Sequence, residues 1–210
     1  MSRANIVVLT GALLLTGGLA QAGELAISLE GGYFDLTMAR KSAQAVFGGS
    51  AGGATFGAQV RLGIGRSFYV ALGGRRFQRD GERAFLADAS SEPYRLGHPL
   101  SVRTMPVYTL VGYRFSPGKR LVPYAGLGFG ITSYREERTV AEIEQEPVTA
   151  AKPSGHLVAG LEWGRSTLRF GVEAMFSTVP GAIGKDGVSK VYGESNVGGL
   201  TIVGKVVLSR

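Results

Sequence analysis

Eight segments of alternating apolar and polar residues are the feature of this sequence that most restricts its fold. Residues 56–64 are typical and read Phe-Gly-Ala-Gln-Val-Arg-Leu-Gly-Ile. Successive side chains of a β-strand point to opposite faces, so the large apolar side chains of this segment share one face, and Gln59 and Arg61 share the other with glycines. This combination of faces is typical of a membrane barrel with a narrow interior.

The connections between the segments alternate between short turns and long loops. The segments are 24–37, 55–64, 68–78, 102–115, 122–134, 155–163, 167–177 and 199–208. The connections 65–67, 116–120 and 164–165 are short and contain glycine or proline, as hairpin turns require. The connections 38–54, 79–101, 135–154 and 178–198 are long. The sequence therefore predicts an all-β protein, an eight-stranded antiparallel up-and-down transmembrane β-barrel with short periplasmic turns and long external loops.

Hairpin pairing tests which side chains share a face, because opposed residues of paired strands point to the same side. A three-residue turn at 65–67 places Gly63 opposite Tyr69, and a two-residue turn at 164–165 places Gly160 opposite Arg169. On the inner face of each hairpin, a small residue thus lies beside a large residue of the neighbouring strand. The interior set is Glu30, Gln59, Arg61, Tyr69, Arg75, Tyr108, Arg114, Tyr124, Glu162, Arg169, Glu173 and Lys205.

The charged members of this interior set predict an ion-pair network that plugs the lumen. Charges removed from water are retained when they are paired and hydrogen-bonded. The predicted network pairs Glu30, Glu162 and Glu173 with Arg61, Arg114, Arg169 and Lys205. An ion pathway or narrow, porin-like pore is the alternative, since ionisable groups within a membrane are often functional. We favour the plug, because an eight-stranded barrel has room for little besides its own side chains.

Aromatic residues gather beside the short turns on the opposite, outward face. An interfacial aromatic girdle lies at this depth in outer-membrane barrels. The predicted girdle residues are Phe68, Tyr113, Phe115 and Trp163.

The N-terminal residues predict export. Arg3 supplies a positive charge, residues 6–15 are apolar, and Ala20-Gln21-Ala22 has the small-x-small pattern of a cleavage site. We therefore expect residues 1–22 to be a cleaved secretory signal peptide and residues 23–210 to be the barrel domain. No later segment has the roughly 18 uninterrupted apolar residues of a transmembrane helix. The predicted location is the cell outer membrane, reached through the periplasm.

Two neighbouring stretches resemble a known family. Residues 111–115 read Val-Gly-Tyr-Arg-Phe, and residues 122–130 read Val-Pro-Tyr-Ala-Gly-Leu-Gly-Phe-Gly. With the short turn between them, they resemble the central hairpin of the small outer-membrane β-barrel superfamily of Gram-negative bacteria, which includes the transmembrane domain of outer membrane protein A. The resemblance implies insertion by the barrel assembly machinery. Members of that family usually end in an aromatic residue, whereas this chain ends Leu208-Ser209-Arg210.

A hydrolase is a weaker interpretation of the same sequence. Some small outer-membrane barrels modify lipid A with a histidine and a serine. Ser154 and His156 share a face of one predicted strand, and Glu173 lies on the neighbouring strand. The lipid A deacylases, however, carry histidine before serine on this strand, which is the reverse order. We therefore expect no catalytic site, and a lipid A-modifying enzyme remains an alternative.

Composition limits the remaining partners. There is no cysteine, so thiolate metal sites, disulfides and cysteine nucleophiles are excluded, and the acidic residues within 136–146 lack a calcium-loop pattern. We expect no metal and no cofactor. The net charge of +7 is spread over lumen, turns and loops, which does not favour nucleic acid. Basic loop residues suited to lipopolysaccharide phosphates are Arg40, Lys41, Arg83, Arg95, Lys185 and Lys190.

The sequence thus predicts a monomer surrounded by outer-membrane lipids and lipopolysaccharide, with a structural or surface-interaction role. A secreted, lipocalin-like binder is a further alternative, which predicts purification without detergent.

Overall fold

The structure is a computed structural model that describes residues 22–140, 143–144, 147–165 and 167–210. The predicted signal peptide lies outside the described residues except for Ala22, so its removal stays a prediction. Part of the acidic loop 136–146 also lies outside them.

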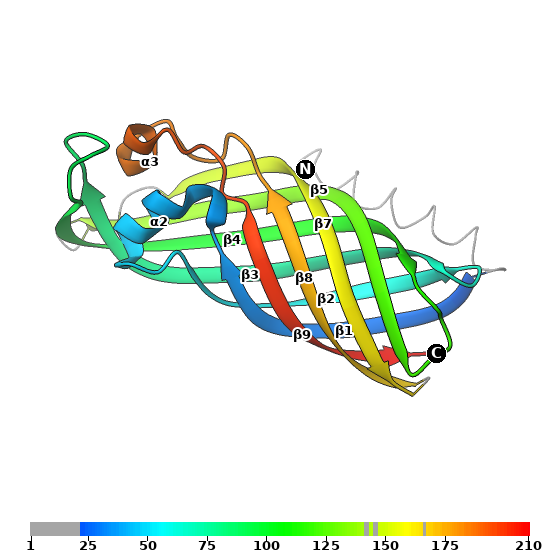
Figure 1. The fold of residues 1–210 in the computed structure, drawn as a ribbon. Helices are drawn as coiled ribbons and strands as arrows, with labels where there is room; N and C mark the ends of the chain where they lie inside the picture. The colour runs from blue at the N-terminus through cyan, green and yellow to red at the C-terminus, as the bar shows by residue number, and fades with distance from the viewer. Residues whose placement is uncertain (1–21, 141–142, 145–146, 166) are drawn as a thin grey trace, which may run out of the picture.

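Eight antiparallel strands close into a ring (Figure 1). The strands are β1 (Ala22–Asp35), β2 (Gly52–Ile64), β3 (Phe68–Phe85), β4 (Tyr94–Arg114), β5 (Leu121–Val140), β7 (Val148–Gly164), β8 (Leu168–Thr178) and β9 (Gly199–Ser209). Each pairs with its neighbour along the chain, β9 pairs with β1, and the two-residue strand β6 (Ile143–Glu144) pairs only with β5, outside the ring. The predicted eight-stranded antiparallel barrel is confirmed.

The two faces of the wall are divided as predicted. Along β9 every second residue is buried, from Gly199 to Ser209. The large apolar side chains between them point outward, and Phe129 on β5 is the most exposed of those in the described wall, at 74%. The charged interior residues are instead buried. The molecule therefore has an apolar outer surface and a polar interior, as a membrane environment requires. Among the described residues, no helix is long and apolar enough to span a membrane.

One hairpin has a different register from the predicted one. The β2–β3 pairing places Gly63 opposite Tyr69, as expected. In the β7–β8 hairpin, however, Gly160 lies opposite Glu173, and Arg169 lies opposite Gly164. The reason is a wider turn, in which the backbone N–H of Arg165 donates to the carbonyl of Leu168 at 3.1 Å. The pairing moves by an even number of residues, so every side chain keeps its predicted face.

Two of the predicted long loops are largely strand. β3, β4, β5 and β7 continue beyond the ends of β1, β2, β8 and β9, so parts of 79–101 and 135–154 form a curved extension of the sheet (Figure 1). These segments are rich in charged residues and lack the strict alternation of the membrane-spanning part, which hid them from a pattern-based prediction.

The other two long loops form a cap over one end of the barrel. We define the cap as residues 36–47, with the turn η2 (Thr37–Ala39) and the helix α2 (Arg40–Phe47), and residues 179–197, with the helix α3 (Gly187–Tyr192). Figure 1 shows both helices at the end opposite the short turns. An apolar cluster joins the cap to the barrel wall and includes Phe34, Leu36, Phe77, Val102, Val179 and Val197.

A single carboxylate ties the two parts of the cap together. Glu194 accepts hydrogen bonds from the backbone N–H groups of Lys41 at 3.1 Å and Ser42 at 2.8 Å, and from the Ser42 hydroxyl at 2.5 Å. The first N–H groups of a helix lack partners within the helix and favour negative charge. Glu194 therefore serves as the N-terminal cap of α2 although it is distant in sequence.

Candidate functional site

The lumen near the short turns is crossed by a first layer of buried ion pairs. Arg61 donates two hydrogen bonds to Glu162, one of them at 3.0 Å from Nη2 to Oε2. Arg114 donates to Glu24 at 2.6 Å, and Arg169 lies 3.8 Å from Glu162 and 3.7 Å from Glu24. Glu162 is fully buried and Glu24 is 26% exposed at its side chain. This layer links strands β1, β2, β4, β7 and β8.

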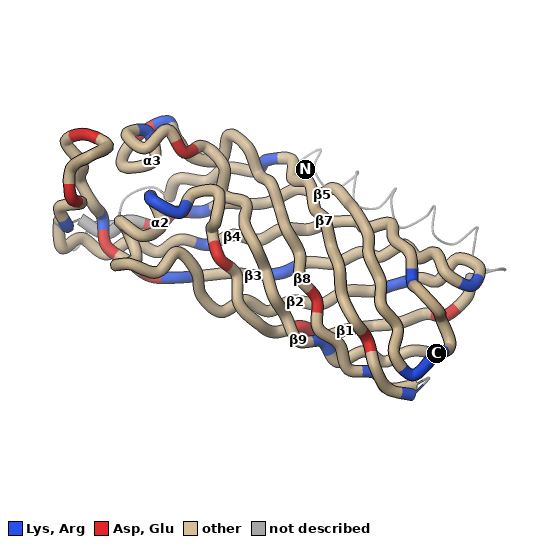
Figure 2. Tube along the Cα trace, viewed as in Figure 1, with Lys and Arg blue, Asp and Glu red and all other residues tan. Residues whose placement is uncertain are grey.

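A second layer lies deeper in the barrel. Arg75 donates to Glu30 at 2.8 Å and also bonds Glu173. Lys205 donates to Glu173 at 2.8 Å and lies 3.2 Å from Glu30, while the Tyr124 hydroxyl donates to Glu173 at 2.7 Å. Figure 2 shows that acidic and basic positions are distributed over several strands of the wall. The two layers form a salt-bridge network across the interior.

Two network residues were missed, and one predicted partnership is wrong. Arg114 was expected to pair with Glu30, Glu162 or Glu173, but it pairs with Glu24, which was outside the predicted interior set. Arg75 belonged to that set without a partner, yet it bonds both carboxylates of the second layer. Face assignments identified the charged residues, but partners across the lumen depend on strand tilt and side-chain length, which the pattern does not contain.

Tyrosines and glycines fill the rest of the interior in matched positions. The rings of Tyr69, Tyr108 and Tyr124 lie over Gly112, Gly73 and Gly160. A Cβ atom on Gly73 would be 2.8 Å from the Tyr108 ring. The glycines therefore provide the space that the rings occupy.

Of the predicted catalytic candidates, Ser154 and His156 lie inside the lumen between the second charge layer and the cap, and Glu173 belongs to that layer. Ser154 Oγ is 3.0 Å from His156 Nε2, and His156 Nδ1 is 2.9 Å from Ser177 Oγ. Glu173 does not orient this histidine: its carboxylate bonds residues of the charge network. Ser177, and not Glu173, therefore lies beside His156 Nδ1, and the absence of a catalytic site stays a prediction.

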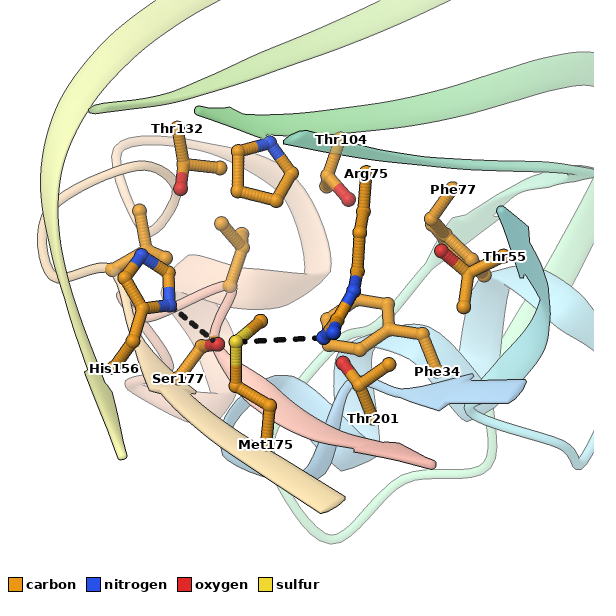
Figure 3. Close-up of a pocket in the computed structure, with 14 residues that line it drawn as sticks. Phe34, Thr55, Arg75, Phe77, Thr104, Thr132, His156, Met175, Ser177 and Thr201 are labelled. Atoms are coloured by element: carbon orange, nitrogen blue, oxygen red, sulfur yellow. Dashed lines mark hydrogen bonds between the residues drawn. The ribbon is translucent and has the colours of Figure 1, made fainter. Parts of the chain in front are cut away.

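His156 and Ser177 border a small cavity between the charge network and the cap (Figure 3). Phe34, Phe77 and Val197 close it toward the cap, and Arg75 and Met175 line its opposite side. Its volume is about 20 Å³. A cavity of this size has room for about one water molecule.

The predicted girdle residues lie on the outward face at the short-turn end. Phe68 and Tyr113 contact edge to face with ring centroids 5.2 Å apart, and Tyr113 contacts Phe115 in the same way at 5.1 Å. Trp163 is 40% exposed on β7. Their position is consistent with an interfacial girdle, which stays a prediction.

A larger cavity of about 300 Å³ lies between the cap and the extended sheet, and we call it the cap pocket. Its apolar walls come from α2, from β4 and from the segment after β8, and include Leu36, Val46, Phe47, Leu100, Val102 and Ile183. Charged side chains line it as well, namely Arg83, Glu136, Lys185 and Asp186. Sequence reasoning missed this pocket, because its walls come from segments far apart in the chain and from helices that were not predicted.

Solved structures of small outer-membrane β-barrels have the same fold. Neisserial surface protein A is 12% identical over 89% of this chain and 97% of its own, with a TM-score of 0.52. A major outer membrane protein from Thermus thermophilus is 10% identical over 89% of this chain and 99% of its own, with a TM-score of 0.56. No protein-family model matches the sequence, and no curated protein matches it.

These comparisons confirm the resemblance at the level of the fold. The chain has the architecture of a small outer-membrane β-barrel, with a buried salt-bridge network inside. Identities of 10–12% show only that the fold is shared, so the function must be argued from the site.

Proposed function

We propose that this chain is a monomeric outer-membrane β-barrel with a closed lumen and a structural or surface-interaction role. The salt-bridge network carries the proposal. Two of its carboxylates are bonded to guanidinium groups on distant strands across the lumen, as in the Glu162–Arg61 and Glu173–Arg75 pairs. An open ion path would have to break such buried pairs, each of which costs about 3–5 kcal/mol to disrupt from one side.

The geometry around His156 supports a structural role for that residue rather than hydrolysis. An acyl-ester substrate would have to reach Ser154 Oγ, but this serine is 5% exposed, and its hydrogen-bond partner His156 lines a cavity of only about 20 Å³. That space takes one water molecule and no acyl chain. The Ser154–His156–Ser177 hydrogen bonds instead satisfy polar groups that the fold buries.

Three outward arginines support lipopolysaccharide as the lipid partner. Arg103 lies directly opposite Arg135 on the neighbouring strand, and Arg76 and Arg103 both donate to the Gln78 side-chain oxygen, at 2.7 and 3.2 Å. These residues lie just beyond the apolar band, whose last members here include Val107 and Ile131. Like charges directly opposite on one face destabilise a strand pair. Glu137 lies 2.8 Å from Arg135, whereas Arg76 and Arg103 have no ion-pair partner among the described residues. A lipid A phosphate has the charge and the depth for this position.

Bilayer recordings on the refolded chain test the closed lumen. We expect no steady open-channel current, because the two layers of buried ion pairs lie across the lumen and block the passage of ions. Steady currents from the monomer would contradict the proposal. A second sample, the Arg61→Ala/Glu162→Ala variant, tests sensitivity: it removes the most buried ion pair of the first layer and should raise the frequency of brief openings.

Cell fractionation and lipid A analysis test the location and the absence of catalysis. The protein should appear in the outer-membrane fraction, with heat-modifiable gel migration, and expression should leave lipid A acylation unchanged. Altered acylation that disappears in His156→Ala would favour the lipid A-modifying alternative. Recovery in the water-soluble fraction would favour the secreted binder.

The lipopolysaccharide contact has its own variant. Arg76→Gln/Arg103→Gln/Arg135→Gln should retain several-fold less lipopolysaccharide after purification, since each lost charge-assisted bond weakens the contact. The control is Arg66→Gln/Arg120→Gln/Arg165→Gln, which removes three arginines from the short-turn end. Equal retention by both variants would exclude this site.

Insertion by the barrel assembly machinery is part of the same proposal and predicts loss of the folded form when that machinery is depleted.

A further inference from the structure

We propose that the cap pocket binds a long-chain carboxylate, with the acyl chain between the cap and the extended sheet and the carboxylate at Arg83 and Lys185. The inference rests on the proposed function, because it names a ligand class for the surface-interaction role of the cap. Three properties of the pocket support it: the chemistry of its walls, its charge and its size.

The walls are apolar and are built from elements that fix their shape. Leu100 and Val102 lie on β4, which pairs with β3 and β5 along this part of the extension. Val46 and Phe47 lie on α2, whose N-terminus is held by Glu194. Apolar cavities do not attract water, and concave apolar sites with a few polar groups are the usual form of small-molecule sites. The pocket is therefore preformed for a chain of methylene groups.

The charge of the pocket selects the head group. Four charged residues line it, and each of the two acidic ones, Glu136 and Asp186, has a partner within the chain. Glu136, for example, accepts the Tyr134 hydroxyl at 2.8 Å. Arg83 and Lys185 form no ion pair with any residue that the structure describes. Two cations without an ion-pair partner beside an apolar cavity favour an anionic head over a neutral or cationic one.

The size of the pocket sets the length of the chain. Its volume is about 300 Å³. A site for one water molecule needs only about 10–15 Å³ of the same kind of space, so the pocket has room for a chain of roughly ten methylene groups. Short-chain acids would leave most of the pocket empty. A single-chain carboxylate such as dodecanoate is therefore the appropriate probe.

Titration calorimetry of the full chain in phospholipid nanodiscs tests the proposal, with empty nanodiscs as the blank for partitioning into lipid. We expect saturable binding of one dodecanoate per barrel. Ala84→Trp and, separately, Val46→Trp place an indole in the cavity and should each weaken binding by at least about tenfold, since they occupy the volume of the chain. If dodecanoate released no more heat with the protein than with empty nanodiscs, the proposal would be overturned. Binding of wild-type affinity by both Trp variants would also overturn it.

The head group is tested with a charge variant and a neutral ligand. Arg83→Gln/Lys185→Gln should weaken dodecanoate binding by about tenfold, because both charge-assisted contacts are lost. The control Arg40→Gln/Lys190→Gln removes two cations from the same cap without touching the pocket, and it should bind like the wild type. Dodecanol should bind more weakly than dodecanoate. Equal affinity for the two ligands would overturn the assignment of an anionic head.

The same samples separate this inference from the proposed function. Heat-modifiable migration and closed-channel recordings report on the barrel, and calorimetry reports on the pocket. A closed, membrane-inserted barrel that does not bind dodecanoate would overturn the inference alone. A protein that is soluble without detergent, or that conducts steadily, would overturn the proposed function whatever it binds.

Discussion

At the scale of single residues, the interior of this barrel depends on charges that have no access to water. Glu162 shows the extreme case: its side chain is fully buried and bonds Arg61 twice. The favourable Coulomb energy of such a pair is offset by the cost of removing both charges from water. The pair therefore contributes little net stability as a unit, whereas removal of one partner leaves a buried charge alone.

Glu162→Gln should for this reason destabilise the barrel by about 3–5 kcal/mol, a large effect for so conservative a change. The side chain keeps its shape and loses its charge, so the loss measures a buried Arg61 left with only the more distant Glu24, 3.9 Å away. Urea unfolding of the protein refolded into lipid vesicles would provide the free energy of unfolding.

The matched control for this prediction removes both charges. Glu162→Leu/Arg61→Leu should recover most of the lost stability, because apolar side chains of similar volume replace a buried pair at little cost. A loss below about 0.5 kcal/mol in the single variant, as at an exposed site, would contradict the interpretation.

At the scale of elements, each strand of the wall has an outer face that tolerates larger side chains and an inner face that does not. A methyl group added to Gly31 on β1 would point outward and meet no atom within 4 Å, whereas Gly73 on β3 lies under the Tyr108 ring. Gly73→Val should therefore cost about 1–3 kcal/mol through overpacking of the lumen. Gly31→Ala should change the free energy of unfolding little, and equal losses in the two variants would show that the ring does not limit the space at Gly73.

The cap helix depends on a capping group from another part of the chain. Glu194→Gln keeps an acceptor but removes the charge that faces the N-terminus of α2. Loss of a helix cap costs about 1 kcal/mol, so local opening of α2 should become about fivefold more frequent. Limited trypsin cleavage after Lys41, which is exposed, would measure this rate. Ser195→Ala, beside the capping residue, is the control and should leave the cleavage rate unchanged.

At the scale of the whole molecule, the barrel and the cap are held by different interactions. The ring is a closed set of backbone ladders with no free edge between its strands in the membrane-spanning part. The cap is held by an apolar cluster and one capping carboxylate. Elements with fewer buried contacts open at lower free energy than the main fold.

Unfolding should accordingly occur in two stages. With rising urea, cleavage after Lys41 should increase first, at concentrations where the emission of Trp163, the single tryptophan, is still that of the folded barrel. Trp163 lies at the short-turn end, far from the cap, and reports on the ring. Coincident midpoints for the two signals would show that cap and barrel form one cooperative unit.

Much of the barrel could be predicted because its signal is local. The alternation in 56–64 determines which side chains face the lumen, and the turns at 65–67 and 116–120 mark the hairpins. The β7–β8 register could not be predicted, because glycine at the turn allows more than one loop length. The even difference in register kept Arg169 and Glu173 on the predicted face.

The sequence by itself therefore determined the number of strands, their facing and the charged content of the lumen, since each follows from a period of two residues along the chain. Only the tertiary structure decided which charges meet, as in the Arg75 contacts with Glu30 and Glu173, and which segments build the cap pocket. The physical reason is distance: pairing across a lumen and packing of a cap depend on strand tilt and on contacts between residues far apart in the chain.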